Sequence, residues 1–186
     1  MLVLASASPR RRELLLSAGI SFVVHAADIP EDSKQGEEPR AFAERLAREK
    51  ALAVFRQRPD DQVLGADTIV VVDGQILGKP RDKKDAARML RMLSGRRHEV
   101  ITGVCLAGKS IAADTRSATT SVTVAALTDK EIAAYIATGE PMDKAGAYAI
   151  QGRASRWITH IDGDYSNVVG LPVPLLWQML RQHQLA

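Results

Sequence analysis

The sequence is poor in cysteine, histidine and aromatic residues. Its 186 residues include one cysteine and four histidines, and aromatic side chains make up 4% of the chain. Because Cys105 has no second cysteine, an intramolecular disulfide and a thiolate metal cluster are excluded, and a reducing compartment is expected. The histidines lack the His-x-x-x-His spacing of many zinc sites.

Long hydrophobic runs and a one-sided charge are also absent. No apolar run approaches the ~18–20 residues of a membrane-spanning helix, and the N-terminus lacks the basic-then-apolar order of a signal peptide. We therefore expect a cytoplasmic protein without a membrane partner. The formal net charge is only +3, from 25 basic and 22 acidic residues. A length of 186 residues with 46% hydrophobic content is typical of one compact domain, and we expect residues 1–186 to form it.

Segments with strand and helix patterns alternate along the chain. Strands are expected at 1–5, 20–26, 63–72, 99–107 and 117–127, and helices at 9–19, 39–56, 82–93, 129–138 and from 172 to the C-terminus. Asp73-Gly74 predicts a tight hairpin, and Thr128 with Glu131 predicts a capping box. The hairpin and two adjacent long strands indicate a mixed sheet, so we predict an α/β fold with a mixed twisted sheet flanked by helices.

The first candidate site lies where the first strand meets the first helix, at Ser6–Arg12. Ser8 is a suitable N-cap and Pro9 suits the first helical position. The free amides and partial positive charge of a helix N-terminus, with Arg10 and Arg11 beside them, suit a phosphate group. The alternative is that Ser8 only caps the helix and the arginines face solvent.

Two lysines could add positive charge. On a helical projection Lys50 lies in the middle of an apolar face, where it either extends its stem to the surface or points into a site. Lys79 follows the hairpin in Gly78-Lys79-Pro80, which could equally be an ordinary turn.

Asp67 is an isolated carboxylate in a strand rich in β-branched residues, and a buried charge of this kind needs a partner. It could accept backbone amides near Gly65, bind a cation or handle a proton. Together with the acids Glu31, Glu37 and Glu38 it offers hard oxygen ligands, so Mg²⁺ or Mn²⁺ is the expected metal. The glycine-punctuated segment 140–152 has neither helical nor strand period, which suits a cleft-lining loop or a connector.

Several motifs together resemble those of the Maf family of nucleotide pyrophosphatases. They are Ser6-x-Ser8-Pro9-Arg10-Arg11-x-Glu13-Leu14-Leu15, Leu46-Ala47-x-x-Lys50-Ala51, Gly65-Ala66-Asp67-Thr68, Gly78-Lys79-Pro80, Ser94-Gly95-x-x-His98-x-Val100, Asp143-Lys144-Ala145-Gly146-x-Tyr148 and Asn167-Val168-Val169-Gly170-Leu171-Pro172. The resemblance runs from the first strand to the last helix.

The resemblance implies a fold like that of inosine-triphosphate pyrophosphatases and the Ham1 proteins. It also implies a divalent-metal-dependent cut between the α- and β-phosphates of a nucleoside triphosphate. Asp67 matches the family's proton acceptor, and Arg11, Thr68 and Gln151 match positions associated with choice of base. The run from Asp143 to Gly152 resembles the dTTP/UTP branch, with modified pyrimidine triphosphates as further substrates.

The resulting hypothesis assigns a role to each candidate residue. Ser8, Arg10 and Arg11 bind the outgoing phosphates, while Lys50 and Lys79 neutralise the triphosphate. Asp67 activates water with Mg²⁺ or Mn²⁺ present, held by Asp67 itself and by Glu31.

Three alternatives stay open. The substrate could be 7-methyl-GTP instead, or the protein could be a nucleotide-binding regulator of septum formation. A homodimer is compatible with either. The cluster Arg10-Arg11-Arg12 allows nucleic-acid binding, against which the low aromatic content argues.

Overall fold

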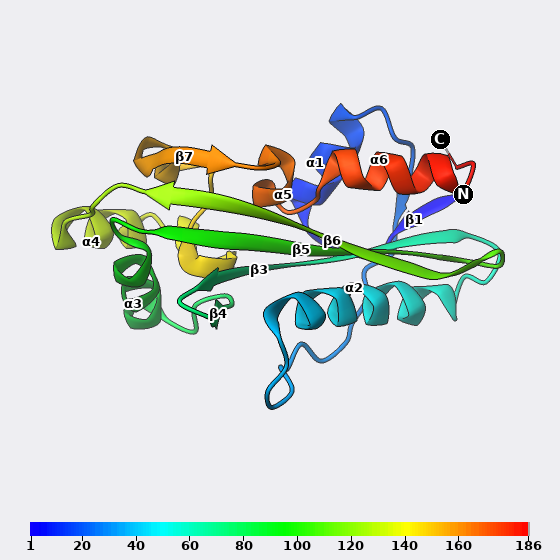
Figure 1. The fold of residues 1–186 in the computed structure, drawn as a ribbon, viewed down its shortest axis with the longest axis horizontal. Coiled ribbons are helices and arrows are strands. Elements are labelled where there is room, and N and C mark those ends of the chain that lie inside the picture. Colours follow the sequence, from blue (N-terminus) through cyan, green and yellow to red (C-terminus); the bar gives the residue numbers. More distant parts are fainter. Residues whose placement is uncertain (186) are drawn as a thin grey trace. The chain divides into compact units, whose positions relative to one another are not determined.

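The computed structural model describes residues 1–185, which form two compact units (Figure 1). The first unit contains Met1–Thr68, Thr102–Ala118 and the residues from Gly170 onward, and the second contains Ile69–Ile101 and Thr119–Val169. Strands β3, β5 and β6 contribute residues to both. Compact units defined by contacts need not fold independently, so the single domain stays a prediction.

The strands pair into one mixed sheet with the order β2-β1-β3-β5-β6-β7, and β4 pairs with β3. Their bounds are β1 Leu2–Leu4, β2 Val23–Val24, β3 Gln62–Val72, β4 Gln75–Leu77, β5 Arg97–Gly108, β6 Ile111–Val124 and β7 Ile158–Asp162. The β1 strand is parallel to β2 and β3, whereas β4 is antiparallel to β3 and β7 is antiparallel to β6. The predicted mixed sheet is therefore confirmed.

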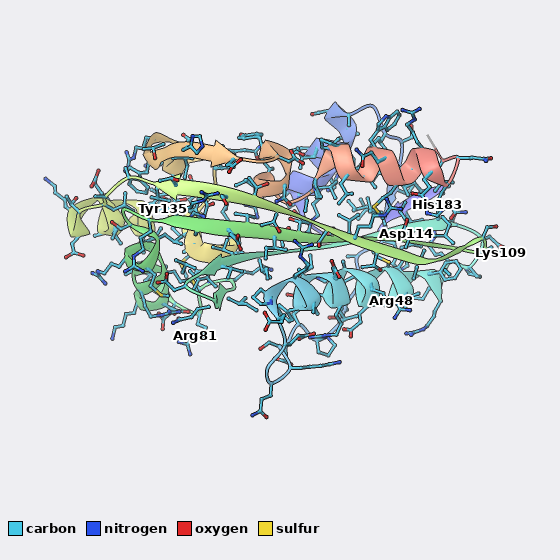
Figure 2. The ribbon with its side chains drawn as sticks, viewed as in Figure 1. Arg48, Arg81, Lys109, Asp114, Tyr135 and His183 are labelled. Carbon is cyan, nitrogen blue, oxygen red and sulfur yellow. The ribbon has the colours of Figure 1, made fainter. Side chains whose placement is uncertain are left out.

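In the first unit, helices cover both faces of the strands (Figure 1). Helices α1 (Pro9–Ser17) and α6 (Val173–Gln182) pack on one face, and α2 (Pro39–Phe55) packs on the other. Successive residues of β3 point to opposite faces, so Leu64 packs with Leu15 and Leu176 while Val63 packs with Ala51. The end of α6 is held by His183, whose Nε2 lies 3.0 Å from Oδ2 of Asp114 on β6 (Figure 2).

Two glycines let α2 approach the sheet closely. A Cβ atom on Gly65 of β3 would overlap the carbonyl oxygen of Ala47 and lie 2.7 Å from the nitrogen of Ala51. A Cβ on Gly103 of β5 would lie 2.5 Å from the carbonyl carbon of Ala43. These neighbours are backbone atoms of a regular helix, which cannot move aside separately. The two glycines therefore set the height of α2 above the strands.

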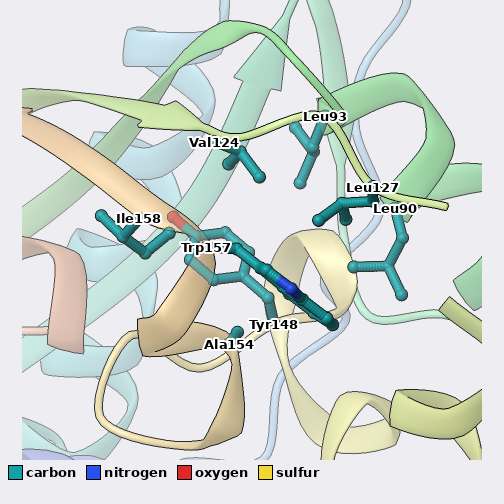
Figure 3. A pocket seen from close by; sticks show the side chains of 8 residues that line it. All are labelled: Leu90, Leu93, Val124, Leu127, Tyr148, Ala154, Trp157 and Ile158. Carbon is teal, nitrogen blue, oxygen red and sulfur yellow. The ribbon is translucent and has the colours of Figure 1, made fainter. Parts of the chain in front are cut away.

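The second unit holds the remaining helices, namely α3 Lys83–Leu93, α4 Asp129–Ala137, α5 Tyr165–Val169 and the 3₁₀ helices η1 Glu140–Asp143, η2 Ala145–Ala147 and η3 Arg153–Trp157. A small pocket here is lined by Leu90, Leu93, Val124, Leu127, Tyr148, Ala154, Trp157 and Ile158 (Figure 3). Its lining is almost wholly apolar, so the side chains that converge on it form a core rather than a polar ligand site.

Within residues 1–185, no helix combines the length and hydropathy needed to cross a membrane.

Local signals with a specific geometry are confirmed. Asp73 and Gly74 both have positive φ, 49° and 74°, as the predicted two-residue hairpin requires. The capping box between Thr128 and Glu131 is present at the start of α4.

The strand expected at 20–26 is wrong in extent, because only Val23–Val24 pair. Ile20 instead closes helix α1. Its amide donates to the carbonyl of Leu15 and that of Gly19, at φ 69°, donates to Leu16, the pattern of a Schellman motif. The strand expected from 117 begins at Ile111, since pairing with β5 overrides the polar sequence there, and β7 was not expected at all.

His98 lies buried on β5, with Nε2 2.8 Å from the hydroxyl of Tyr148 and the two rings edge to face. Burial lowers the pKa of His98 to about 4, from an ordinary value near 6.5. A depressed histidine pKa means that the unfolded chain binds the extra proton first. Stability is therefore complete above about pH 6.5 and is lost as the pH falls toward 4, by about 3 kcal/mol from this group.

Urea denaturation of the wild type and of His98→Gln between pH 7 and pH 4 tests this expectation. The variant should lose less stability across that range, while His160→Gln, at an exposed position, should follow the wild type. Parallel curves for wild type and His98→Gln would contradict it.

Candidate active site

The turn between β1 and α1 is built by its two serines. Ser8 Oγ accepts a hydrogen bond from the amide of Arg11 at 3.5 Å, and Ser6 Oγ accepts one from the amide of Ser8 at 3.2 Å. Pro9 occupies the first turn of α1, where its missing N–H costs nothing. Ser8 is thus the predicted N-cap, and a role for it in binding phosphate stays a prediction.

Arg11 is buried and connects three parts of the first unit. Its Nε donates to the carbonyl of Gly170 at 2.8 Å, one terminal nitrogen donates to Ser6 Oγ at 3.0 Å, and the other donates to Thr68 Oγ1 at 3.0 Å. Burial lowers the pKa of the Arg11 guanidinium, and the charges of Asp67 and Glu31 oppose that shift. Arg11 and Thr68 are therefore in direct contact, and the part in choice of base that the resemblance implies for both stays a prediction.

Lys50, Asp67 and Glu31 meet at one point of the first unit. The Lys50 ammonium lies 2.6 Å from Asp67 Oδ1 and 2.5 Å from Glu31 Oε1. The side chains of Lys50 and Asp67 are 10% and 11% exposed, against 50% for Glu31. Lys50 therefore points to the buried Asp67 carboxylate and to the half-exposed Glu31 and does not extend freely to the surface, and the partner that Asp67 needs is this lysine.

Glu31 belongs to a polar segment, residues 28–38, that is tied to α2 by Arg45. The guanidinium of Arg45 bonds both carboxylate oxygens of Glu37, at 2.6 and 2.8 Å, and the carbonyl of Asp32 at 3.0 Å. The hydrogen bond from Arg45 lowers the pKa of Glu37 to about 2. Glu37, one of the acids expected to offer a metal ligand, is thus bound to arginine, while Glu31 is the acid of this segment that reaches Lys50.

The donor set suits a hard divalent cation. Asp67 and Glu31 each place one carboxylate oxygen on the Lys50 ammonium, so the two carboxylates lie close together. Mg²⁺ is commonly bound by one or two carboxylates together with substrate phosphates. Among residues 1–185 no group of three or more His, Cys, Asp or Glu side chains could hold a metal. A metal held by Asp67 and Glu31 would therefore complete its coordination with water or with phosphate oxygens of the substrate.

Comparison with known proteins tests whether the chain belongs to the family that its motifs resemble. The family model for Maf-like proteins matches residues 1–183. The chain belongs to the Maf family. A dTTP/UTP pyrophosphatase of Koribacter versatilis is 59% identical over 97% of this chain and 93% of that protein. One of Geobacter metallireducens is 56% identical over 92% of this chain and 90% of that protein.

A solved structure bears on the fold of this Maf protein. The Ham1 protein of Staphylococcus aureus superposes with a TM-score of 0.52 over 98% of each chain, at 14% sequence identity. At that identity the likeness shows the fold alone. The α/β fold of the Ham1 type implied by the motifs is thereby confirmed, as is membership of the Maf family.

The remaining candidate residues of this Maf protein lie outside the Lys50 cluster. Arg10 is half-buried in the first turn of α1. Lys79 and Gln151 are exposed and belong to the second unit, Lys79 just after β4 and Gln151 in the turn between η2 and η3. Their roles in binding substrate stay predictions.

Sequence patterns missed two contributors to this site. Arg45 precedes Glu49 by four residues, a spacing that predicts an ordinary ion pair on the surface of a helix. That spacing does not predict the second ion pair, between Arg45 and Glu37. Thr102 of β5 has its Oγ1 3.0 Å from that of Thr68, and nothing in the order of residues signals that contact.

Proposed function

We propose that this protein is a nucleoside triphosphate pyrophosphatase that hydrolyses dTTP and UTP, and modified pyrimidine triphosphates, to the monophosphate and pyrophosphate. Relatives of more than 50% identity carry the name dTTP/UTP pyrophosphatase. The structural observation that carries the proposal is the meeting of Lys50, Asp67 and Glu31 in the electrostatic reach of Arg11. This arrangement joins acids that can hold a metal or accept a proton to cations that can hold phosphates.

Binding of the triphosphate rests on the cations. The Lys50 ammonium has three N–H donors, and Asp67 and Glu31 accept two of them, so the third can reach a phosphate oxygen. The positive end of the α1 dipole, the guanidinium of Arg10 and the remaining N–H groups of Arg11 attract the outgoing phosphates. Lys79 neutralises further charge. In phosphoryl transfer, positioning and charge neutralisation supply most of the rate.

Cleavage rests on Asp67. In the proposed step a water molecule passes its proton to the Asp67 carboxylate while its oxygen attacks the α-phosphorus. The bond between that phosphorus and the oxygen bridging to the β-phosphate breaks, and pyrophosphate leaves with the bonding electrons. Asp67 and Glu31 would hold Mg²⁺ or Mn²⁺, which neutralises developing charge on the phosphates. A carboxylate bound directly to metal is a poor proton acceptor, so contact through water suits the base role of Asp67 better.

A substrate panel tests the function. Release of pyrophosphate from dTTP, UTP, 7-methyl-GTP and the common purine triphosphates should be measured with Mg²⁺ and with Mn²⁺. We expect the highest kcat/KM for dTTP and UTP. A preference for 7-methyl-GTP would favour the other branch of the family, and tight binding without turnover in either metal would favour a regulatory protein.

Choice of base is assigned to Gln151, whose amide offers a donor and an acceptor to the polar edge of a pyrimidine. Gln151→Ala should lower the ratio of kcat/KM for dTTP to that for dATP about tenfold, because one or two hydrogen bonds to the base are lost. Gln178→Ala, at an exposed position of α6, should leave the ratio unchanged. An unchanged ratio in Gln151→Ala would rule out this role.

Location and assembly remain sequence-based proposals. We infer a cytoplasmic protein because its one cysteine, Cys105, is unpaired and buried, and burial raises the pKa of its thiol. A homodimer is compatible with the family resemblance. Light scattering after size-exclusion chromatography measures the mass in solution directly.

A further inference from the structure

The turn that carries Gln151 is held on both sides by side chains from elsewhere in the second unit. Gln151 itself is exposed, whereas Ala149 and Ile150 before it are buried. The amide of Ala149 donates to the hydroxyl of Tyr135 at 3.2 Å, and the amide of Arg153 donates to Oε1 of Glu140 at 3.0 Å. The backbone is therefore hydrogen-bonded two residues before Gln151 and two residues after it.

Tyr135 and Glu140 are also bonded to each other. The Tyr135 hydroxyl donates to Oε1 of Glu140 at 2.7 Å, so one chain of hydrogen bonds runs from Ala149 through both side chains to Arg153. The ring of Tyr135, on α4, is fully buried and packs edge to face on Trp157 with centroids 5.2 Å apart. The buried ring makes the hydroxyl a fixed reference point for the turn.

Gly152 brings the Glu140 carboxylate directly against this turn. A Cβ atom at position 152 would lie 2.5 Å from Cδ of Glu140. Glycine therefore leaves room for the carboxylate here, and its amide also closes the turn by donating to the carbonyl of Ala149 at 3.0 Å. The turn, the Glu140 carboxylate and the Tyr135 hydroxyl are therefore packed directly against one another.

We propose that Tyr135 and Glu140 are positioning residues that orient Gln151 and so set the base preference of the enzyme. The inference rests on the proposed function, in which Gln151 contacts the base. A side-chain amide discriminates between bases only when its donor and acceptor are held in a fixed direction. Gln151 projects from a short turn into solvent, so the backbone beneath it must supply that fixed direction.

A purely structural role for the two residues makes a different prediction. Loss of packing or of general stability would lower the activity on all triphosphates by the same factor. Loss of orientation at Gln151 lowers kcat/KM for the preferred base while leaving that for other bases nearly unchanged. The ratio between substrates therefore separates the two roles.

The experiment measures kcat/KM for dTTP and dATP in four variants. Tyr135→Phe removes the hydroxyl and keeps the ring on Trp157, and Glu140→Ala removes the carboxylate. Both should lower the dTTP-to-dATP ratio about tenfold, as Gln151→Ala does. Glu140→Gln keeps an acceptor for Tyr135 and Arg153 and should retain the ratio. Tyr165→Phe, at an exposed tyrosine of α5, is the matched control and should behave as the wild type.

A double variant tests whether Tyr135 acts on the dTTP-to-dATP ratio of kcat/KM through Gln151. If Tyr135 acts through Gln151, Tyr135→Phe should have no further effect on the ratio when Gln151→Ala is already present. A ratio that falls again in the double variant, or an equal loss on dTTP and dATP in the single variants, would overturn the proposal.

Failure of the proposed function is distinguishable from failure of this inference. A wild-type enzyme without pyrimidine preference, or a Gln151→Ala variant with the wild-type ratio, would overturn the role of Gln151 and with it the inference. A ratio that depends on Gln151 but not on Tyr135 or Glu140 would overturn the inference alone.

Discussion

Asp67→Asn should lower kcat for dTTP by about 10²–10⁴-fold, the usual contribution of a general base, in a protein that remains folded. The amide keeps the shape of the side chain and an oxygen toward Lys50, but it cannot accept a proton from water. Lys50 also keeps its ion pair with Glu31, at 2.5 Å, so it does not lose every negative partner. Pyrophosphate release under saturating dTTP and Mg²⁺ measures the effect.

The control for Asp67→Asn is another carboxylate of the first unit. Asp61 pairs with Arg58 and with the N-terminal amine and has no place in the proposed chemistry. Asp61→Asn should therefore keep the wild-type kcat. An Asp67→Asn variant that is folded by circular dichroism and turns over dTTP at the wild-type rate would show that the assigned mechanism is wrong.

Metal titration of the same variant separates the two roles of Asp67. If Asp67 binds the metal directly, residual activity in Asp67→Asn should require a higher Mg²⁺ concentration than in the wild type. If Asp67 only accepts the proton, the Mg²⁺ requirement should stay near the wild-type value while kcat falls.

Gly65→Ala should destabilise the protein by about 3 kcal/mol or more, which corresponds to a fall in Tm of roughly 6–12 °C for a chain of this length. The new methyl group would overlap backbone atoms of Ala47 and Ala51, so α2 has to move away from β3. Lys50 lies on the same helix, and its 2.6 Å contact with Asp67 would lengthen. We therefore expect kcat/KM to fall together with Tm, as measured by thermal denaturation and turnover.

Gly78→Ala is the matched control for Gly65→Ala. A Cβ at Gly78 would meet no atom within 4 Å, so the same change of residue should alter Tm little. Equal Tm values for Gly65→Ala and the wild type would mean that the close approach of α2 is not required.

Local structure was predictable from the sequence where a turn or a helix cap accepts few residue types. The Asp73-Gly74 hairpin and the capping box of Thr128 depend on backbone conformations and bonds within four residues. The strand expected at 20–26 was wrong because Ile20 serves a helix end, a competing local use of an apolar residue. The β7 strand, Ile158–Asp162, is mostly exposed and takes its structure from pairing with β6, which no local pattern announces.

The candidate chemistry was predictable from residues that break their local pattern. A lysine on an apolar helix face and an aspartate in an apolar strand both carry charge where burial is expected, and burial requires each to find a partner. The sequence by itself therefore determined that Asp67 would be buried with a partner, that Ser8 would cap α1 and that the fold would be a mixed α/β sheet. For Lys50 it left two alternatives, a stem extended to the surface or a side chain pointing into a site.

Only the tertiary structure decided which groups meet. Lys50 and Asp67 are on separate elements, and their 2.6 Å contact depends on the height of α2, which Gly65 and Gly103 set by packing against backbone. Glu31 reaches the same point because Arg45 holds its irregular segment, and Arg11 binds Thr68 rather than solvent. Such contacts join residues far apart in the chain, so their geometry follows from packing and cannot be obtained from local periodicity.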